Sequence, residues 1–207
     1  MKKISDEEIA RLDAMMEYER IYSDSCRYIC GIDEVGRGPL AGPVVASAVI
    51  LPKDTYYMYL NDSKKVTEKR REKLYDEITE SAISWSVGVI SPEVIDEINI
   101  LQATYKAMQQ AIAGLSVRPD IILVDAVTIP DIDIPQKGII KGDAKSVSIA
   151  AASIVAKVYR DRMMYEYDKI YPEYMFAKNK GYGTKAHMDA LRSIGMSPIH
   201  RRSFVHI

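Results

Sequence analysis

The sequence has few of the residues that would indicate a secreted, membrane-bound or zinc-binding protein. It has two cysteines in 207 residues, Cys26 and Cys30, and neither has companion ligands at zinc-site spacing. We therefore expect reduced thiols and a cytoplasmic location. No apolar run approaches the roughly 18 residues that cross a membrane. No apolar core follows the charged start of the chain, so we expect neither a signal peptide nor a membrane partner.

Two common motifs of hydrolases and nucleotide-binding proteins are also missing. The chain has no Gly-x-Ser-x-Gly nucleophile elbow and no phosphate-binding loop ending in Gly-Lys-Ser. Its composition, 47% hydrophobic and 28% charged, is that of one ordinary globular domain with a substantial core. Any hydrolytic chemistry must therefore come from other groups, and carboxylates are the best candidates.

The most informative stretch is Gly31-Ile32-Asp33-Glu34-Val35-Gly36-Arg37-Gly38. Adjacent residues of a strand point to opposite faces, so Asp33 and Glu34 cannot both be surface charges if both faces are covered. Buried carboxylates are rare unless they are paired or bind a metal. Gly36 and Gly38 leave backbone N–H groups around Arg37 open to a ligand. This pattern favours a site for a metal and a phosphate together, and a charged turn after an edge strand is the alternative.

Two further acids follow apolar runs. Asp125 ends Ile121-Ile122-Leu123-Val124, and Asp143 follows Ile139-Ile140-Lys141-Gly142. Ligands of α/β proteins bind at strand ends, and four carboxylates gathered there would repel one another without cations. Oxygen ligands alone favour Mg²⁺ or Mn²⁺, and two such ions support in-line phosphoryl displacement. Taken singly, each of these two acids could instead be a helix cap or a turn residue.

Basic residues are concentrated in two segments, which suits a polyanionic partner. The first lies within residues 64–73, and the second is the tail from Lys178 onward. The tail contains Gly181-Tyr182-Gly183, whose tyrosine could stack on a sugar or base. A solvated helix face and a common turn are the alternatives for these features.

Apolar periodicity predicts an α/β fold with a mixed sheet. Strands are expected at 28–33, 43–51, 84–90 and 121–124. Helices are expected at 6–21, 67–81 and 146–171, with another apolar helical stripe that follows Ser91-Pro92 and ends at Gly114.

Taken together, the motifs resemble ribonuclease HII, the bacterial type 2 ribonuclease H. The matching stretches are GIDEVGRGPLAGPVVASAVIL (31–51), NDSKK (61–65), LVDA (123–126), KGDAKSVSIAAASIVAKVYRD (141–161), GYGT (181–184) and HRRSF (200–204). The resemblance implies a ribonuclease H-like fold, a central mixed sheet flanked by helices with a small helical C-terminal part. Residues 28–207 would form the catalytic domain, and residues 1–27 a helical arm outside it.

The resemblance also implies an activity. It is endonucleolytic hydrolysis of the RNA strand of RNA–DNA hybrids, and cutting on the 5′ side of single ribonucleotides embedded in DNA. The products would carry 3′-hydroxyl and 5′-phosphate ends, and the cofactor would be a pair of Mg²⁺ or Mn²⁺ ions. The partner would be nucleic acid, and we expect a monomer.

The family's functional positions fall on defined residues here. Its four metal-binding acids fall on Asp33, Glu34, Asp125 and Asp143. Its substrate-reading positions fall on Gly36, Arg37, Gly38, Lys64 and Tyr182. Asp161 is expected to be structural and salt-bridged, and Lys180, Lys185, Arg201 and Arg202 are candidate phosphate contacts.

Two other functions remain open on the sequence alone. One is a different metal-dependent nuclease of the same fold, because fold does not fix function. The other is a nucleic-acid-binding protein whose catalytic site has decayed. Cutting of all-DNA substrates would favour the first, and metal-independent binding without cleavage would favour the second.

Overall fold

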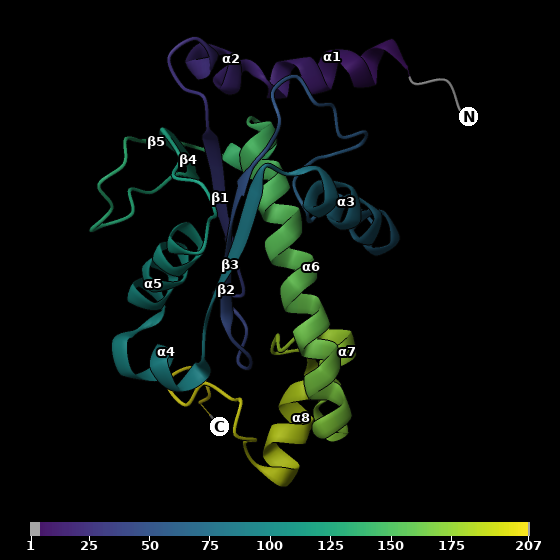
Figure 1. Cartoon of the computed structure of the whole chain (residues 1–207). Coiled ribbons are helices and arrows are strands. Elements are labelled where there is room, and N and C mark those ends of the chain that lie inside the picture. Colours follow the sequence, from purple (N-terminus) through teal and green to yellow (C-terminus); the bar gives the residue numbers. More distant parts are fainter. Residues whose placement is uncertain (1–4, 207) are drawn as a thin grey trace.

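The computed structural model describes residues 5–206, and its centre is a mixed five-stranded sheet (Figure 1). The strand order is β3-β2-β1-β4-β5. The strands are β1 (Ile29–Val35), β2 (Val44–Ile50), β3 (Ser84–Ile90), β4 (Ile121–Asp125) and β5 (Gln136–Ile139). This confirms the predicted mixed sheet.

The pairing of the strands places two of the predicted acids side by side. β1 is antiparallel to β2 and parallel to β4, and Ile32 is the register partner of Val124. Asp33 and Asp125 are the next residues on these two strands, so they lie at the same level of the sheet. β1 continues two residues beyond its predicted end, so Asp33 and Glu34 lie within the strand and face opposite sides of the sheet.

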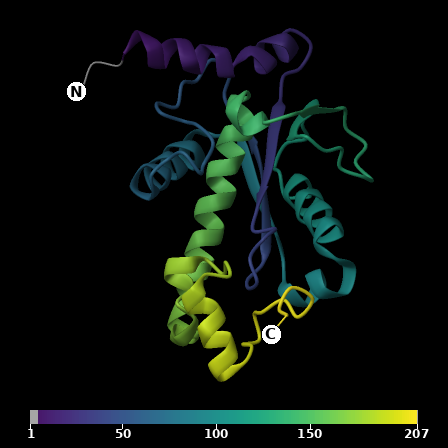
Figure 2. The same ribbon diagram turned by 180° about the vertical axis from the view of Figure 1, so that it is seen from behind.

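Helices cover both faces of the sheet (Figures 1 and 2). One face packs against α6, with α3 outside it, and the other packs against α5. The α-helices are α1 (Asp6–Met15), α2 (Glu17–Ser23), α3 (Glu68–Ser81), α4 (Pro92–Ile98), α5 (Ile100–Ala113), α6 (Val147–Ile170), α7 (Phe176–Asn179) and α8 (Lys185–Ile194). Two 3₁₀ turns, η1 (Gly142–Ala144) and η2 (Pro172–Tyr174), precede and follow α6.

Two predicted helices are each interrupted. The helix expected over 6–21 is divided at Met16 into α1 and α2. The apolar stripe after Pro92 is divided at Asn99, whose φ of 67° ends α4 and whose side chain then caps Leu101 and Gln102 at the start of α5. Asparagine tolerates this left-handed conformation and is a good N-cap. Leu101, expected on the apolar stripe, is 41% exposed.

β1 and α6 approach each other very closely. A Cβ on Gly31 would lie 2.0 Å from the backbone carbon of Ser148. The first turns of α6 carry small residues, and Ser47 of β2 donates a hydrogen bond of 2.7 Å to the carbonyl of Ala152. Small side chains on both sides thus bring the helix backbone against the sheet.

The two ends of the sheet are covered by different parts of the chain (Figure 1). α1 and α2 lie across one end, where Leu12, Met15 and Met16 join the core cluster beneath α6. Glu19 accepts hydrogen bonds from the Ser146 hydroxyl and from the Ser148 N–H, and so caps α6. α7, α8 and the C-terminal segment lie beyond the other end. Within residues 5–206, no helix is both long and apolar enough to span a membrane.

We predict that Gly31→Ala destabilises the protein by about 1–3 kcal/mol or more, because the added methyl group would force β1 away from the backbone of α6. Chemical denaturation would measure the loss. Gly138→Ala in edge strand β5 is the control, because the nearest atom to its added methyl would be 3.3 Å away. An equal loss in the two variants would contradict the importance of the β1–α6 contact.

Candidate active site

Asp33 and Glu34 leave β1 on opposite sides but remain close enough to interact electrostatically. Asp33 is 8% exposed and faces α6, where the hydroxyl of Ser153 stabilises its charged form. Glu34 is half-buried, and one of its oxygens accepts a hydrogen bond of 3.2 Å from the guanidinium of Arg37. The strand therefore delivers two carboxylates to one point of the sheet from its two faces.

Asp125 and Asp143 are connected by a turn that requires a glycine. The backbone N–H of Gly142 donates a hydrogen bond of 2.9 Å to Asp125. A Cβ on Gly142 would lie 2.6 Å from the Cδ1 of Ile149 and 3.5 Å from the Cα of Asp125. Asp143, the next residue, belongs to η1. The 3₁₀ turn thus brings the fourth acid to the end of β4.

Burial and mutual repulsion raise the pKa values of three of these acids. The pKa of Asp33 is well above its ordinary value, because of burial and then because of the neighbouring charges of Glu34 and Asp125. The pKa of Glu34 is raised by burial and by Asp125, although Arg37 opposes the shift. The pKa of Asp143 is raised by burial, Asp62 and Asp125, with Lys64 opposing. The charges of the four acids are therefore linked, and nearby cations balance them only in part.

The chemistry of this group fits a hard divalent cation, because every donor is a carboxylate oxygen. A bound cation would also relieve the repulsion that raises the pKa values. As the side chains stand, no three histidine, cysteine, aspartate or glutamate side chains within residues 5–206 are grouped so as to hold a metal ion. Coordination would therefore need side-chain rotation toward a common point.

The glycine-rich loop and Tyr182 lie against each other. A Cβ on Gly38 would be 3.7 Å from the Cε1 of Tyr182, whose side chain is 47% exposed. The Leu40 N–H donates to the Gly181 carbonyl at 2.8 Å. Among the described residues, no group accepts a hydrogen bond from the backbone N–H of Arg37 or Gly38. Two free donors and an exposed aromatic ring therefore share one surface.

Two buried arginines donate hydrogen bonds to the backbone carbonyls of this loop. Arg160 donates to the carbonyls of Pro43, Ala41 and Lys180 at 2.9, 3.1 and 3.0 Å. Arg201 donates to the carbonyls of Gly36, Arg37 and Gly42 at 2.6 to 3.0 Å. Burial lowers their pKa values to about 10 and about 9, so both remain charged near neutral pH.

The expectation that Arg201 contacts phosphate is therefore wrong. Its side chain is fully buried and its nitrogens are occupied by backbone carbonyls. Lys180 is also partly withdrawn, because its ammonium bonds to the Ala177 carbonyl and lies 3.7 Å from the centre of the Tyr165 ring. Lys185 and Arg202 are exposed.

The structure also places Lys64 and Asp161. Lys64 is exposed on the loop before α3, near enough for its charge to act on Asp143. Asp161 is buried and salt-bridged to Lys157 at 2.6 Å, with Arg71 at 3.9 Å, which confirms the expected salt bridge.

Sequence reasoning missed two contributors. Asp62 of the NDSKK stretch is near Asp143, although nothing set it apart from an ordinary loop acid. The burial of Arg160 could have been predicted, because it lies four residues from both Ala156 and Met164 on the buried side of α6.

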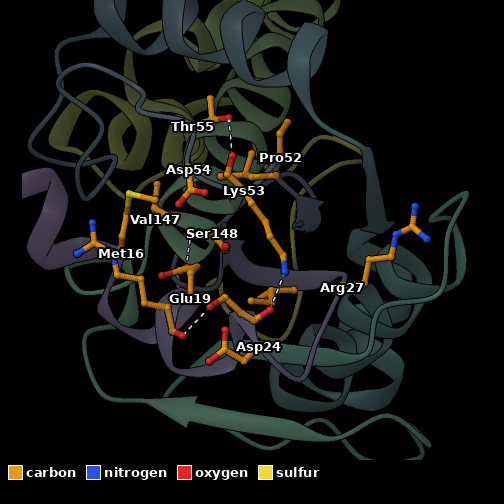
Figure 3. Close-up of a pocket in the computed structure, with 14 residues that line it drawn as sticks. Met16, Glu19, Asp24, Arg27, Pro52, Lys53, Asp54, Thr55, Val147 and Ser148 are labelled. Carbon is orange, nitrogen blue, oxygen red and sulfur yellow. Dashed lines mark hydrogen bonds between the residues drawn. The ribbon is translucent and has the colours of Figure 1, made fainter.

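The structure also has a cavity of about 230 Å³ away from the acids (Figure 3). It lies between α2, the segment after β2 and the start of α6, and Glu19, Lys53 and Ser148 are among its lining residues. None of the four predicted acids lines it. We place the chemistry at the acids, where the pKa values are perturbed, and not in this cavity.

The fold and the site together define a member of the ribonuclease H class of nucleases. The ribonuclease H2 of Pyrococcus horikoshii matches with a TM-score of 0.70 and 27% identity, over 85% of this chain and 93% of that one. The ribonuclease HII of Archaeoglobus fulgidus, solved in complex with PCNA, matches with a TM-score of 0.71 and 26% identity, over 87% and 96% of the two chains.

The family model for ribonuclease HII matches residues 30–207. The ribonuclease HII of Lachnoclostridium phytofermentans is 64% identical over 96% of this chain and 78% of its own length. That of Caldanaerobacter subterraneus is 55% identical over 97% and 83%. The chain belongs to the ribonuclease HII family. It is a metal-dependent endoribonuclease that acts on the RNA of RNA–DNA hybrids.

Two buried aspartates are predicted to respond oppositely to loss of charge. Asp33→Asn should raise the Tm of the metal-free protein by a few degrees, because it removes a buried charge that is repelled by its neighbours. Asp161→Asn should lower the Tm by about 5 °C or more, because it leaves Lys157 and Arg71 unpaired. Calorimetry in chelator would measure both, and a fall in Tm for Asp33→Asn would contradict the repulsion among the acids.

Proposed function

We propose that the enzyme cuts on the 5′ side of a ribonucleotide, including a single one embedded in duplex DNA, at a site formed by Asp33, Glu34, Asp125 and Asp143. Water attacks phosphorus, the bond to the 3′ oxygen breaks, and the products carry a 3′-hydroxyl and a 5′-phosphate. The observation that carries the junction specificity is the contact between Gly38 and the exposed ring of Tyr182. The linked charges of the four acids support the placement of the chemistry.

The four acids hold the cofactor, which we take to be two Mg²⁺ or Mn²⁺ ions. When bound, such a pair activates water and stabilises the departing oxygen. Asp33 and Asp125 are the most rigid ligands in this scheme, because both belong to the hydrogen-bonded strands β1 and β4. Asp143 is carried by a short turn and Glu34 shares its charge with Arg37, so both can adjust.

The loop around Arg37 reads the ribonucleotide in this proposal. A protein distinguishes RNA from DNA at one position through the 2′-hydroxyl. The carbonyls of Gly36 and Arg37 are engaged by Arg201, whereas the N–H groups of Arg37 and Gly38 are available to donate to that hydroxyl. Tyr182 would then stack on the adjoining deoxyribose, where a second 2′-hydroxyl would clash.

Basic side chains next to the acids would hold the duplex. Lys64 is placed to neutralise a phosphate, and Lys65 and Lys69 are exposed on the same segment. The nearby acids Glu68 and Glu72 are engaged by Tyr165 and Arg162. We propose that a monomer acts alone on its substrate, with residues 28–207 as the catalytic domain and the arm of residues 1–27 outside the site.

Asp125→Asn is predicted to lower turnover by about a thousandfold or more while leaving the fold intact, because it keeps the shape but removes one ligand charge. The assay uses a duplex with one ribonucleotide and an all-DNA control, with Mg²⁺, Mn²⁺ or chelator. We expect the parent protein to cut on the 5′ side of the ribonucleotide when metal is present, and Asp125→Asn not to cut. Near-normal turnover by the variant would refute the ligand assignment.

The same assay separates the other candidate functions. Cutting of the all-DNA duplex would indicate a different nuclease specificity on this fold. Binding without any cutting, indifferent to metal, would indicate a decayed site.

Tyr182→Ala is predicted to lower kcat/KM on the single-ribonucleotide duplex by about tenfold or more, since stacking on one nucleotide contributes about 1–3 kcal/mol. Tyr182→Phe keeps the ring and should retain most activity. Steady-state kinetics on both variants tests this. Unchanged cleavage by Tyr182→Ala would rule out stacking.

A further inference from the structure

The two substrate-reading segments are joined by the Leu40–Gly181 hydrogen bond and by Arg160, and also by a short stretch near the C-terminus. Residue His200 forms an antiparallel bridge with Ala41. The Gly42 N–H donates to the Ile199 carbonyl at 2.9 Å, and the Arg201 N–H donates to the Leu40 carbonyl at 2.8 Å. The adjacent side chains of His200 and Arg201 then extend to different segments.

Arg201 reaches the glycine-rich loop. Its guanidinium is completely buried and bonds to the carbonyls of Gly36, Arg37 and Gly42. Three carbonyls held by one rigid group fix the orientation of this loop, because the planar guanidinium allows little adjustment. The N–H groups of Arg37 and Gly38 are thereby oriented as well.

His200 reaches Tyr182 through a second histidine. Its Nε2 lies 2.9 Å from the Nε2 of His187, and the Nδ1 of His187 lies 2.9 Å from the Tyr182 carbonyl. The Ser197 N–H donates to the Nδ1 of His200 at 2.9 Å. One assignment of protons satisfies all these bonds: His200 donates from Nε2 to His187, and His187 donates from Nδ1 to Tyr182.

This assignment requires both imidazoles to be neutral, and their surroundings favour that state. Both rings are buried, and the aromatic rings of Tyr174 and Phe176 pack against them. Burial lowers the pKa values of both, that of His200 to about 4, so the chain of bonds is intact at neutral pH.

We propose that His200 and Arg201 are positioning residues that fix Tyr182 relative to Gly36-Arg37-Gly38, and that selectivity for the RNA–DNA junction depends on them. The proposal rests on the function proposed above. His200 acts through His187 on Tyr182, which is needed where a deoxyribose adjoins the ribonucleotide. Arg201 acts on the loop, which is needed wherever a 2′-hydroxyl is read.

The two residues should therefore affect substrates differently. His200→Phe keeps an aromatic ring beside Tyr174 and Phe176 but removes the bond to His187. It should lower kcat/KM on the single-ribonucleotide duplex by about tenfold, with little change on a continuous RNA–DNA hybrid. Arg201→Lys should lower kcat/KM on both substrates, chiefly through KM, because a lysine cannot hold three carbonyls in one plane.

A double-mutant cycle tests whether His200 acts through Tyr182. In the Tyr182→Ala background, His200→Phe should have no further effect on the junction substrate, because the side chain that it positions is gone. His206→Phe, a change at an exposed histidine, is the control for the substitution, and Arg118→Lys is the control for Arg201→Lys. His187→Asn removes the same His200–His187 hydrogen bond by changing its other partner. It replaces His200→Phe in this test if that variant does not fold.

The outcomes distinguish this proposal from the one on which it rests. Equal losses on both substrates with His200→Phe, or additive losses in the cycle, would overturn the role of His200. Unchanged kinetics with Arg201→Lys would overturn the role of Arg201. If Tyr182→Ala alone has no effect on the junction substrate, the reading of the junction by Tyr182 fails instead.

Discussion

The contact between β1 and α6 is the constraint on which the other features depend. The backbone of α6 lies against Gly31, and from that point the helix runs along β1 toward the glycine-rich loop. Ser153 stabilises the charged form of Asp33 along this course, and Arg160, two turns further on, donates to the carbonyls of Ala41 and Pro43. One helix thus sets the positions of a proposed catalytic acid and of the loop proposed to read the substrate. Its start is fixed in turn by Glu19 from the arm.

The charges of the site are separated in a way that stability alone does not explain. Asp33, Glu34 and Asp143 are partly or wholly buried with incomplete cationic compensation, whereas Arg160 and Arg201 are buried on backbone carbonyls. Within residues 5–206, neither arginine forms an ion pair with a carboxylate. The two buried arginines are satisfied by these carbonyls, whereas the acids lack comparable partners, and buried charges without partners point to a ligand. A cation at the acids would supply the missing partner.

Much of the fold could be predicted from local sequence, but the breaks and the supporting network could not. Strand positions follow from apolar runs, and the small residues at 149–156 allow the close packing of α6. The interruption at Asn99 depends on a single residue in a left-handed conformation, which apolar periodicity does not show. The four acids could be predicted as a site from the sequence because each follows an apolar run. Arg201 was mistaken for a phosphate contact because exposure is decided by the fold and not by the type of residue.

The network of His200 and Arg201 connects two motifs that lie far apart in the chain. The loop comes from the first quarter of the sequence and Tyr182 from the last. The segment at 199–201 binds the loop directly and Tyr182 through His187. A substrate-binding surface built from two segments that are distant in the chain has no covalent restraint on the spacing between them. That spacing must then come from rigid, buried groups, since a displacement of even 1 Å can cost about a hundredfold in rate. Buried guanidinium and imidazole groups supply such rigidity because each bonds in fixed directions, which aliphatic packing does not.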